Sequence, residues 1–110
     1  PKIGLIAPPR GNGHFAARYF MPWDTHPTLA VTGSQCLASC ALMPGTVAEG
    51  VTKPIPASPA VVVIEHPMGE MEVTVTYGDG PSFQSAGLIR TARLIARGEV
   101  MVDPKLMGDA

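Results

Sequence analysis

The sequence predicts a small α+β domain in which one helix packs among β-strands. Residues Gly33 to Met43 are apolar almost all round, as is typical of a helix covered on every side. Val61–Ile64 is β-branched and Met71–Tyr77 alternates apolar with polar residues, so these segments predict a β-hairpin. Lys2–Ala7 is a short apolar run that meets two prolines, which indicates a buried strand entering a turn.

The composition allows one hydrophobic core and leaves little charge to cover it. The chain has 110 residues, of which 45% are hydrophobic and 15% are charged, whereas a charged share of about 25% is typical. We therefore expect a partner to cover part of the surface. With 8 Lys+Arg against 9 Asp+Glu and no basic stripe interleaved with aromatic residues, the sequence excludes a nucleic-acid partner.

The cysteines and the first residues bear on the location of the protein and on whether the chain is part of a longer one. Cys36 and Cys40 supply neither a disulfide framework nor the four ligands of a structural zinc site. We expect no metal, a cytoplasmic location and, without a long apolar run or a secretory signal, no membrane partner. The chain begins at Pro1, already within a predicted strand, so we expect the 110 residues to be part of a longer chain.

The first third of the chain is divided by turn-forming residues. Lys2–Ala7 predicts an inner strand, and Arg10–His14 predicts a loop because it is dense in turn formers. Arg18–Met21 is short and aromatic and is followed by proline, which favours a strand. The polar segment Trp23–Pro27 then leads to the helix.

The helix has recognisable start and stop signals. Thr32-Gly33-Ser34-Gln35 matches a capping box, with Thr32 as the N-cap and Gln35 reaching back to its amide. Pro44-Gly45 predicts the end of the helix. The prolines of Thr46–Pro59 predict a long connection rather than a central strand.

The last third is less regular. His66-Pro67-Met68-Gly69 predicts the turn of the hairpin, and Gly78-Asp79-Gly80-Pro81 predicts the next turn. Leu88–Gly98 is interpreted as a strand followed by a turn, with one helix as the alternative. Glu99–Val102 predicts a last short strand before Asp103-Pro104.

The helix start is also a candidate anion site. A helix N-terminus has unpaired amides and a positive partial charge, and small residues let a carboxylate approach the backbone. Thr32, Gly33 and Ser34 are therefore candidate substrate-binding residues. The competing interpretation is a well-capped helix with no ligand.

Other reactive side chains have structural interpretations as well. His26 is a candidate carboxylate donor, although a lone loop histidine, like His66, is more often structural. Cys36 and Cys40 are interpreted as packed core residues rather than proton-transfer thiols. Arg90 and Arg93, another pair of candidate carboxylate partners, are assigned to a solvated or interfacial face.

Six short motifs in order resemble the C-terminal half of the PrpF family, which includes 3-methylitaconate isomerase, 2-methylaconitate isomerase and 4-oxalomesaconate tautomerase. The resemblance covers nearly the whole chain. The motifs are His26, Val31-Thr32-Gly33, Pro44-Gly45-Thr46-Val47, His66-Pro67-Met68-Gly69, Arg90-Thr91-Ala92-Arg93 and Gly98-Glu99-Val100.

The resemblance implies a diaminopimelate epimerase-like fold, in which each of two halves is a β-rich barrel wrapped around one central helix. Residues 1–110 would then be the C-terminal half-domain, with the N-terminal half outside this sequence and the active site in the cleft between the halves. In related epimerases a catalytic cysteine precedes the first glycine of the helix, and here that position is Thr32. The resemblance places the catalytic cysteine and lysine of the isomerases in the other half, so no catalytic residue is expected in this one.

The expected function is a cofactor-independent isomerase or tautomerase that shifts a C=C bond in an unsaturated di- or tricarboxylate by allylic proton transfer. This half would bind the carboxylates through Thr32, Gly33, Ser34 and His26, and would be inactive alone. The expected partners are the polycarboxylate, the N-terminal half and, left open, further copies of the protein. The alternatives are an amino-acid racemase or epimerase on the same fold, or a non-catalytic binding domain.

Overall fold

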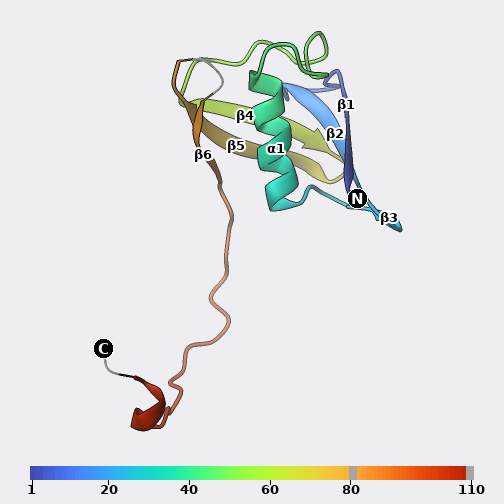
Figure 1. Ribbon diagram of the computed structural model, residues 1–110. Coiled ribbons are helices and arrows are strands. Elements are labelled where there is room, and N and C mark those ends of the chain that lie inside the picture. Colours follow the sequence, from blue (N-terminus) through green and yellow to red (C-terminus); the bar gives the residue numbers. More distant parts are fainter. Residues whose placement is uncertain (80–81, 109–110) are drawn as a thin grey trace.

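The computed structural model describes residues 1–79 and 82–108 and has the predicted α+β class, with one α-helix on one face of a six-stranded sheet (Figure 1). In chain order the elements are β1 (Ile3–Ala7), β2 (Phe15–Met21), β3 (Asp24–Thr25), α1 (Val31–Leu42), β4 (Ala60–His66), β5 (Gly69–Tyr77), β6 (Phe83–Leu88) and the short 3-10 helix η1 (Pro104–Leu106).

The sheet has the order β1-β2-β4-β5-β6, and β3 pairs with β2. Its pairs are antiparallel except β2 and β4, which run parallel with Phe15 opposite Ile64. Because β1 and β6 are the two ends of this order, the sheet is open within the described residues. The barrel that we expected around the helix is therefore not closed by this part of the chain.

Alternation along the strands explains the core. Each central strand turns every second side chain towards α1, where burial of apolar surface stabilises the fold by roughly 25 cal/mol per Å². Ala38 of α1 is fully buried against the sheet. Leu29, which precedes the helix, is buried in the same core. The strand residues of this core are Phe15, Ala17, Tyr19, Val62, Ile64, Val73 and Val75.

The hairpin is confirmed. β4 pairs along its whole length with the part of β5 from Gly69 to Val75, and His66 stands opposite Gly69 across a two-residue turn. Gly69 has φ +138°, a backbone region that glycine adopts far more readily than other residues. The loop after β1, the end of the helix before Pro44 and the long connection to β4 are also found as predicted, and β2 includes the predicted strand Arg18–Met21 but begins earlier, at Phe15.

Two burial predictions are wrong for the described chain. β1 lies at an edge of the sheet rather than inside it, and Ile3 and Leu5 are each 57% exposed. The helix is covered on one side only, since Val31, Thr32 and Cys36 are exposed. Apolar composition indicates that a segment is buried by something, but it does not say that the covering residues belong to the same 110.

The C-terminal third differs most from the prediction. β6 forms over Phe83–Leu88, so only the first residue of the predicted strand in Leu88–Gly98 is in a strand, and Glu99–Val102 forms none. Figure 1 shows the chain after β6 leaving the sheet as an extended tail, which has no neighbouring strand to pair with. Of the predicted turn, Gly80-Pro81 lies outside the described residues.

None of the helices in residues 1–79 and 82–108 has the length and apolar character of a membrane-spanning segment.

Candidate functional site

The parallel pairing of β2 and β4 gathers the candidate residues at one end of the sheet. Because the two strands run in the same direction, Tyr19 near the end of β2 and His66 at the end of β4 lie at the same end of the sheet. The backbone amide of His26 donates to the Tyr19 carbonyl oxygen at 2.8 Å, which brings the chain back to this end of the sheet just before α1 begins. Figure 1 shows that β6 also ends near the helix start.

The start of α1 has no side-chain cap. Ala30 is the N-cap, with extended φ −66° and ψ 147°, and its carbonyl accepts the first helical bond from the Ser34 amide at 2.8 Å. The amides of Val31, Thr32 and Gly33 precede this bond and have no acceptor within the helix. A set of free amides at the positive end of the helix dipole suits a carboxylate.

The predicted capping box is wrong. The helix begins one residue before Thr32, so this threonine lies inside the first turn instead of before it. The Ser34 hydroxyl donates to the Val31 carbonyl at 2.7 Å, and the Gln35 side-chain amide donates to the Ala86 carbonyl of β6 at 2.7 Å. Gln35 therefore ties the helix to the sheet rather than returning to its N-terminus.

The three predicted helix residues face different surroundings. Gly33 and Ser34 are buried, whereas Thr32 is exposed. A β-carbon at Gly33 would stand 2.6 Å from the Tyr19 ring, so the absence of a side chain there allows the helix to pack on β2. Of the three side chains, that of Thr32 is the one at the surface.

His26 lies beside the helix start and is fixed by its own turn. Its ring Nδ1 accepts from the Thr28 amide at 3.1 Å, and the ring meets that of Tyr19 edge-on with centroids 6.4 Å apart. With Nδ1 used as an acceptor, the neutral ring has its proton on Nε2, the nitrogen left to donate to a ligand.

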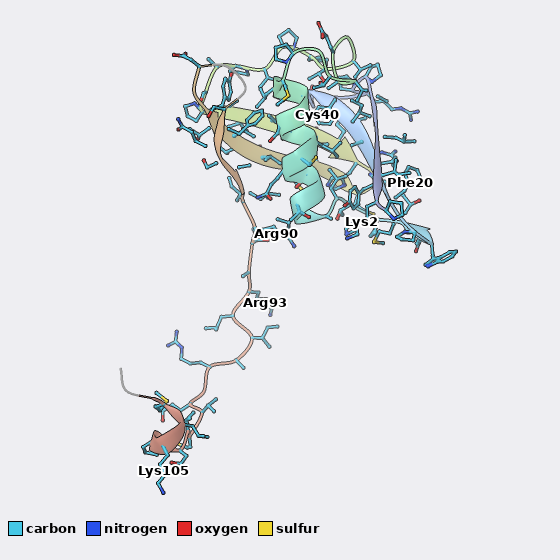
Figure 2. The ribbon with its side chains drawn as sticks, in the orientation of Figure 1. Lys2, Phe20, Cys40, Arg90, Arg93 and Lys105 are labelled. Atoms are coloured by element: carbon cyan, nitrogen blue, oxygen red, sulfur yellow. The ribbon has the colours of Figure 1, made fainter. Side chains whose placement is uncertain are left out.

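A pocket of about 500 Å³ opens at this end of the sheet. It brings together His66 and Arg90 from two separate sequence motifs, together with Thr28, which follows His26. Figure 2 shows Arg90 just beyond the end of the sheet and Arg93 farther out on the tail. The lining residues are Thr28, His66, Glu70, Met71, Glu72, Ile89 and Arg90.

The surroundings of His66 lower the pKa of its ring. Its pKa lies below the ordinary value, first because the ring is partly buried and further because Arg18 and His26 place positive charge nearby, while a hydrogen bond to the Glu70 backbone opposes these effects. Its Nδ1 accepts from the Met68 amide at 3.2 Å. The neutral form of an imidazole can both donate and accept a proton, so His66 can take part in more kinds of chemistry than the sequence indicated.

The cysteines lie away from the pocket. Cys36 is exposed on the outer side of α1 and Cys40 is partly buried, and both are free thiols. The interpretation of Cys36 as a packed core residue is therefore wrong within the described chain. The structure as described contains no group of three or more His, Cys, Asp or Glu side chains that could hold a metal ion.

Arg18 and Thr28 are neighbours of the site that sequence reasoning missed. A single arginine in an alternating strand has the pattern of a solvent-facing residue, and Thr28 stands between turn formers. The parallel pairing of β2 and β4 places Arg18 near His66, and no local pattern in the sequence indicates this pairing.

Comparisons with known proteins agree on one family. The family described as PrpF protein matches residues 1–103. A (4E)-oxalomesaconate Delta-isomerase from Novosphingobium sp. (strain KA1) is 38% identical over 102 residues, which are 93% of this chain and 29% of that protein. A 3-methylitaconate isomerase from Eubacterium barkeri is 38% identical over 78 residues, which are 71% of this chain and 20% of that protein.

A solved structure gives the same result. The crystal structure of methylitaconate-delta-isomerase matches with a TM-score of 0.72 and 26% identity, and the match covers 94% of this chain and 33% of that one. The chain thus spans less than a third of the length of the curated relatives that it matches.

Proposed function

The chain belongs to the PrpF family, and on this premise we propose that it is part of an isomerase that shifts a C=C bond in an unsaturated di- or tricarboxylate. The relatives named above are isomerases of oxalomesaconate and methylitaconate, and both names denote unsaturated polycarboxylates. One structural observation carries the proposal. The uncapped start of α1 lies at the same end of the sheet as the pocket that contains His66 and Arg90.

The proposed role of this chain is to bind carboxylates and stabilise charge. The free amides at the start of α1 and the Arg90 guanidinium are donors for carboxylate oxygens. The exposed Thr32 hydroxyl and the Nε2–H of His26 would add further donors. Gly33 is buried and would contribute its backbone amide, whereas the amide and hydroxyl of buried Ser34 already donate to Ala30 and Val31, so Ser34 would support the turn.

The proposed reaction needs such donors. Removal of an allylic proton leaves a dienolate-like carbanion, and return of the proton at the other end of the allyl system completes the shift. The intermediate has more negative charge than the substrate, so fixed donors stabilise it more than the ground state. We propose that no cofactor takes part and that the proton-transfer residues lie outside this chain.

The proposal includes a larger fold and a location. The exposed flank of α1 and the apolar side chains of the tail support a second domain that covers them, as in an epimerase-like pair of domains in the cytoplasm. Val31 on this flank is 43% exposed. On the tail, Ile89, Ile95 and Val100 are 75%, 91% and 86% exposed. So many exposed apolar side chains are typical of a surface that meets another part of a protein.

The test is isotope exchange with the full-length protein. The protein is incubated in deuterated water with each of a panel of unsaturated di- and tricarboxylates, and the reaction is followed by proton NMR. Deuterium should enter the allylic position as the double bond moves. Arg90→Met should raise KM by about tenfold, since it removes a charge-assisted hydrogen bond to a carboxylate. Arg97→Met, on the same tail but outside the pocket lining, is the matched control and should leave KM unchanged.

Two results would contradict the proposal. Binding of the carboxylates without exchange would indicate a non-catalytic binding domain. Inversion of an amino-acid stereocentre would indicate a racemase, which the threonine at position 32 argues against.

A further inference from the structure

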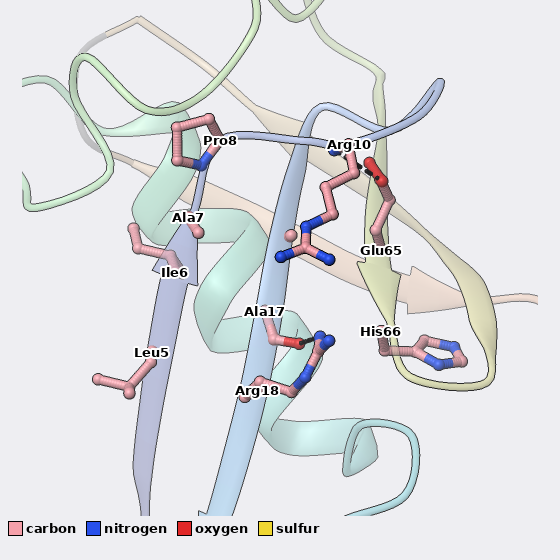
Figure 3. A pocket seen from close by; sticks show the side chains of 10 residues that line it. Leu5, Ile6, Ala7, Pro8, Arg10, Ala17, Arg18, Glu65 and His66 are labelled. Carbon is pink, nitrogen blue, oxygen red and sulfur yellow. Dashed lines mark hydrogen bonds between the residues drawn. The ribbon is translucent and has the colours of Figure 1, made fainter.

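A second pocket lies on the face of the sheet that is turned away from α1. It has a volume of about 420 Å³ and is bordered by β1, β2, the end of β4 and the loop between β1 and β2. In the sheet register Leu5 stands opposite Arg18, and Ala16 stands opposite both Ala7 and Glu65, so these side chains share one face. Figure 3 shows this face with the helix behind it.

Two arginines from different elements line this pocket. Arg18 comes from the middle of β2, and Arg10 comes from the loop that crosses the top of β2 and β4 (Figure 3). His66 stands at the rim, and Arg18 is close enough to lower its pKa. The Arg18 guanidinium donates to the carbonyl oxygen of Ala17 at 3.0 Å, a contact that leaves most of its fork for another acceptor.

The acidic residue of the lining, Glu65, is occupied by backbone donors. Its carboxylate accepts from the amide of Arg10 at 3.0 Å and from the amide of Gly11 at 2.8 and 3.2 Å. Its oxygens are thus directed at the loop backbone rather than at either guanidinium. Among the described lining residues, two permanent positive charges face one carboxylate, and the pocket has a net positive charge.

The loop that bears Arg10 is held in place. The Lys53 ammonium donates to the Gly11 carbonyl at 3.1 Å, and the Lys53 amide donates to the His14 carbonyl at 2.8 Å. The His14 amide donates to the Val63 carbonyl at 2.8 Å. Together with Glu65 these bonds fix both ends of the loop before any ligand arrives, which reduces the entropy lost on binding.

We propose that this pocket is a binding site for a small organic anion, whose carboxylate is held by Arg10 and Arg18 and whose hydrocarbon part lies on the apolar wall. The apolar side chains of the wall are those of Leu5, Ala7 and Pro8. Guanidinium forks match carboxylate oxygens in geometry as well as charge. The site adjoins the pocket at the start of α1 through His66, which lines both, but it does not depend on the proposed isomerase activity.

The experiment is a titration of the full-length protein with hexanoate and, separately, with inorganic phosphate, followed by ligand-observed NMR. Arg10→Met and Arg18→Met remove the charge and keep an apolar stem. Each should raise the Kd for hexanoate by about tenfold, as expected when a charge-assisted hydrogen bond is lost. Arg97→Met on the tail is the control and should bind like the wild type. Phosphate should bind more weakly than hexanoate, because it cannot use the wall.

The outcomes are distinct. Wild-type affinity for hexanoate in both Arg10→Met and Arg18→Met would overturn the site. If phosphate binds as tightly as hexanoate, the proposal that the ligand is an organic anion held on the apolar wall is wrong. Arg10→Met should keep the wild-type KM for the unsaturated carboxylates while Arg90→Met raises it by about tenfold, so failure of this proposal and failure of the proposed function are read from different variants.

Discussion

Tyr19 lies so close to the first turn of α1 that Gly33 has no room for a side chain. A β-carbon at Gly33 would stand 2.6 Å from Cε2 and 2.9 Å from Cζ of Tyr19. The same ring meets His26 edge-on. One aromatic side chain therefore sets both how closely the helix start approaches β2 and where the neighbouring imidazole lies.

Gly33→Ala should lower the free energy of unfolding by about 1–3 kcal/mol, the usual cost of adding a methyl group to a packed contact. Urea unfolding measures this change. Gly87→Ala is the control, because a β-carbon there meets nothing within 4 Å. In a Tyr19→Leu background the penalty at Gly33 should shrink, and equal penalties in both backgrounds would show that Tyr19 is not the cause.

The stability of the fold should fall as the pH drops below the ordinary pKa of histidine. His14 Nδ1 accepts from the Val63 amide at 2.9 Å, and the pKa of His14 lies below 6.5 because burial and then the charge of Lys53 disfavour the imidazolium. The unfolded chain therefore binds the proton first, and the stability present above 6.5 is lost as the pH falls towards the lowered pKa. Unfolding experiments between about pH 8 and about pH 5 measure this loss.

The control for this prediction is His14→Gln, which should flatten part of the pH dependence. A residual slope of the same sign should remain, because the pKa of His66 is lowered too, and His14→Gln/His66→Gln should be flatter still. A wild type that becomes more stable on acidification would contradict the prediction.

Glu65→Ala should release the loop between β1 and β2. The carboxylate accepts from the amides of Arg10 and Gly11, so its loss leaves both without this acceptor. Amide hydrogen exchange at these two residues should become faster, and the free energy of unfolding should fall by about 1 kcal/mol. Glu72→Ala, on the same face of neighbouring β5, is the control. Unchanged exchange at Gly11 would show that other contacts hold the loop.

Cys36 should report whether a second domain covers the helix. In the 110-residue chain Cys36 is exposed and Cys40 partly buried, so iodoacetamide should modify Cys36 faster. In the full-length protein the proposed domain pair should slow this reaction, with Cys36→Ser identifying the modified site. Equal rates at Cys36 in the two proteins would contradict the covering of this flank.

The sequence was sufficient where neighbours in the fold are neighbours in the chain. The β4–β5 hairpin follows from β-branched residues, strict alternation and a two-residue turn. The helix was also found, but its start was misplaced because Gln35, which a capping box would use, instead bonds to Ala86 of β6. Long-range contacts of this kind are not encoded in local spacing.

The errors in the strands and in the site have a similar origin. Phe83–Leu88 lacks a clear apolar alternation and becomes a strand because β5 offers it an edge. Glu99–Val102 has a better strand composition and no neighbour to pair with. In the second pocket, Arg18 and Glu65 have the sequence pattern of ordinary surface charges. The parallel pairing of β2 with β4 is what brings them together.

The extended tail makes the structure long for its number of residues. Its radius of gyration is 18.3 Å and its longest extent is 59 Å, whereas a compact chain of this length has a radius of gyration of about 13 Å. Small-angle scattering can therefore follow the tail directly. In neutron scattering with a contrast-matched, separately expressed upstream segment, a contraction of this chain's own radius would show that residues 89–108 dock.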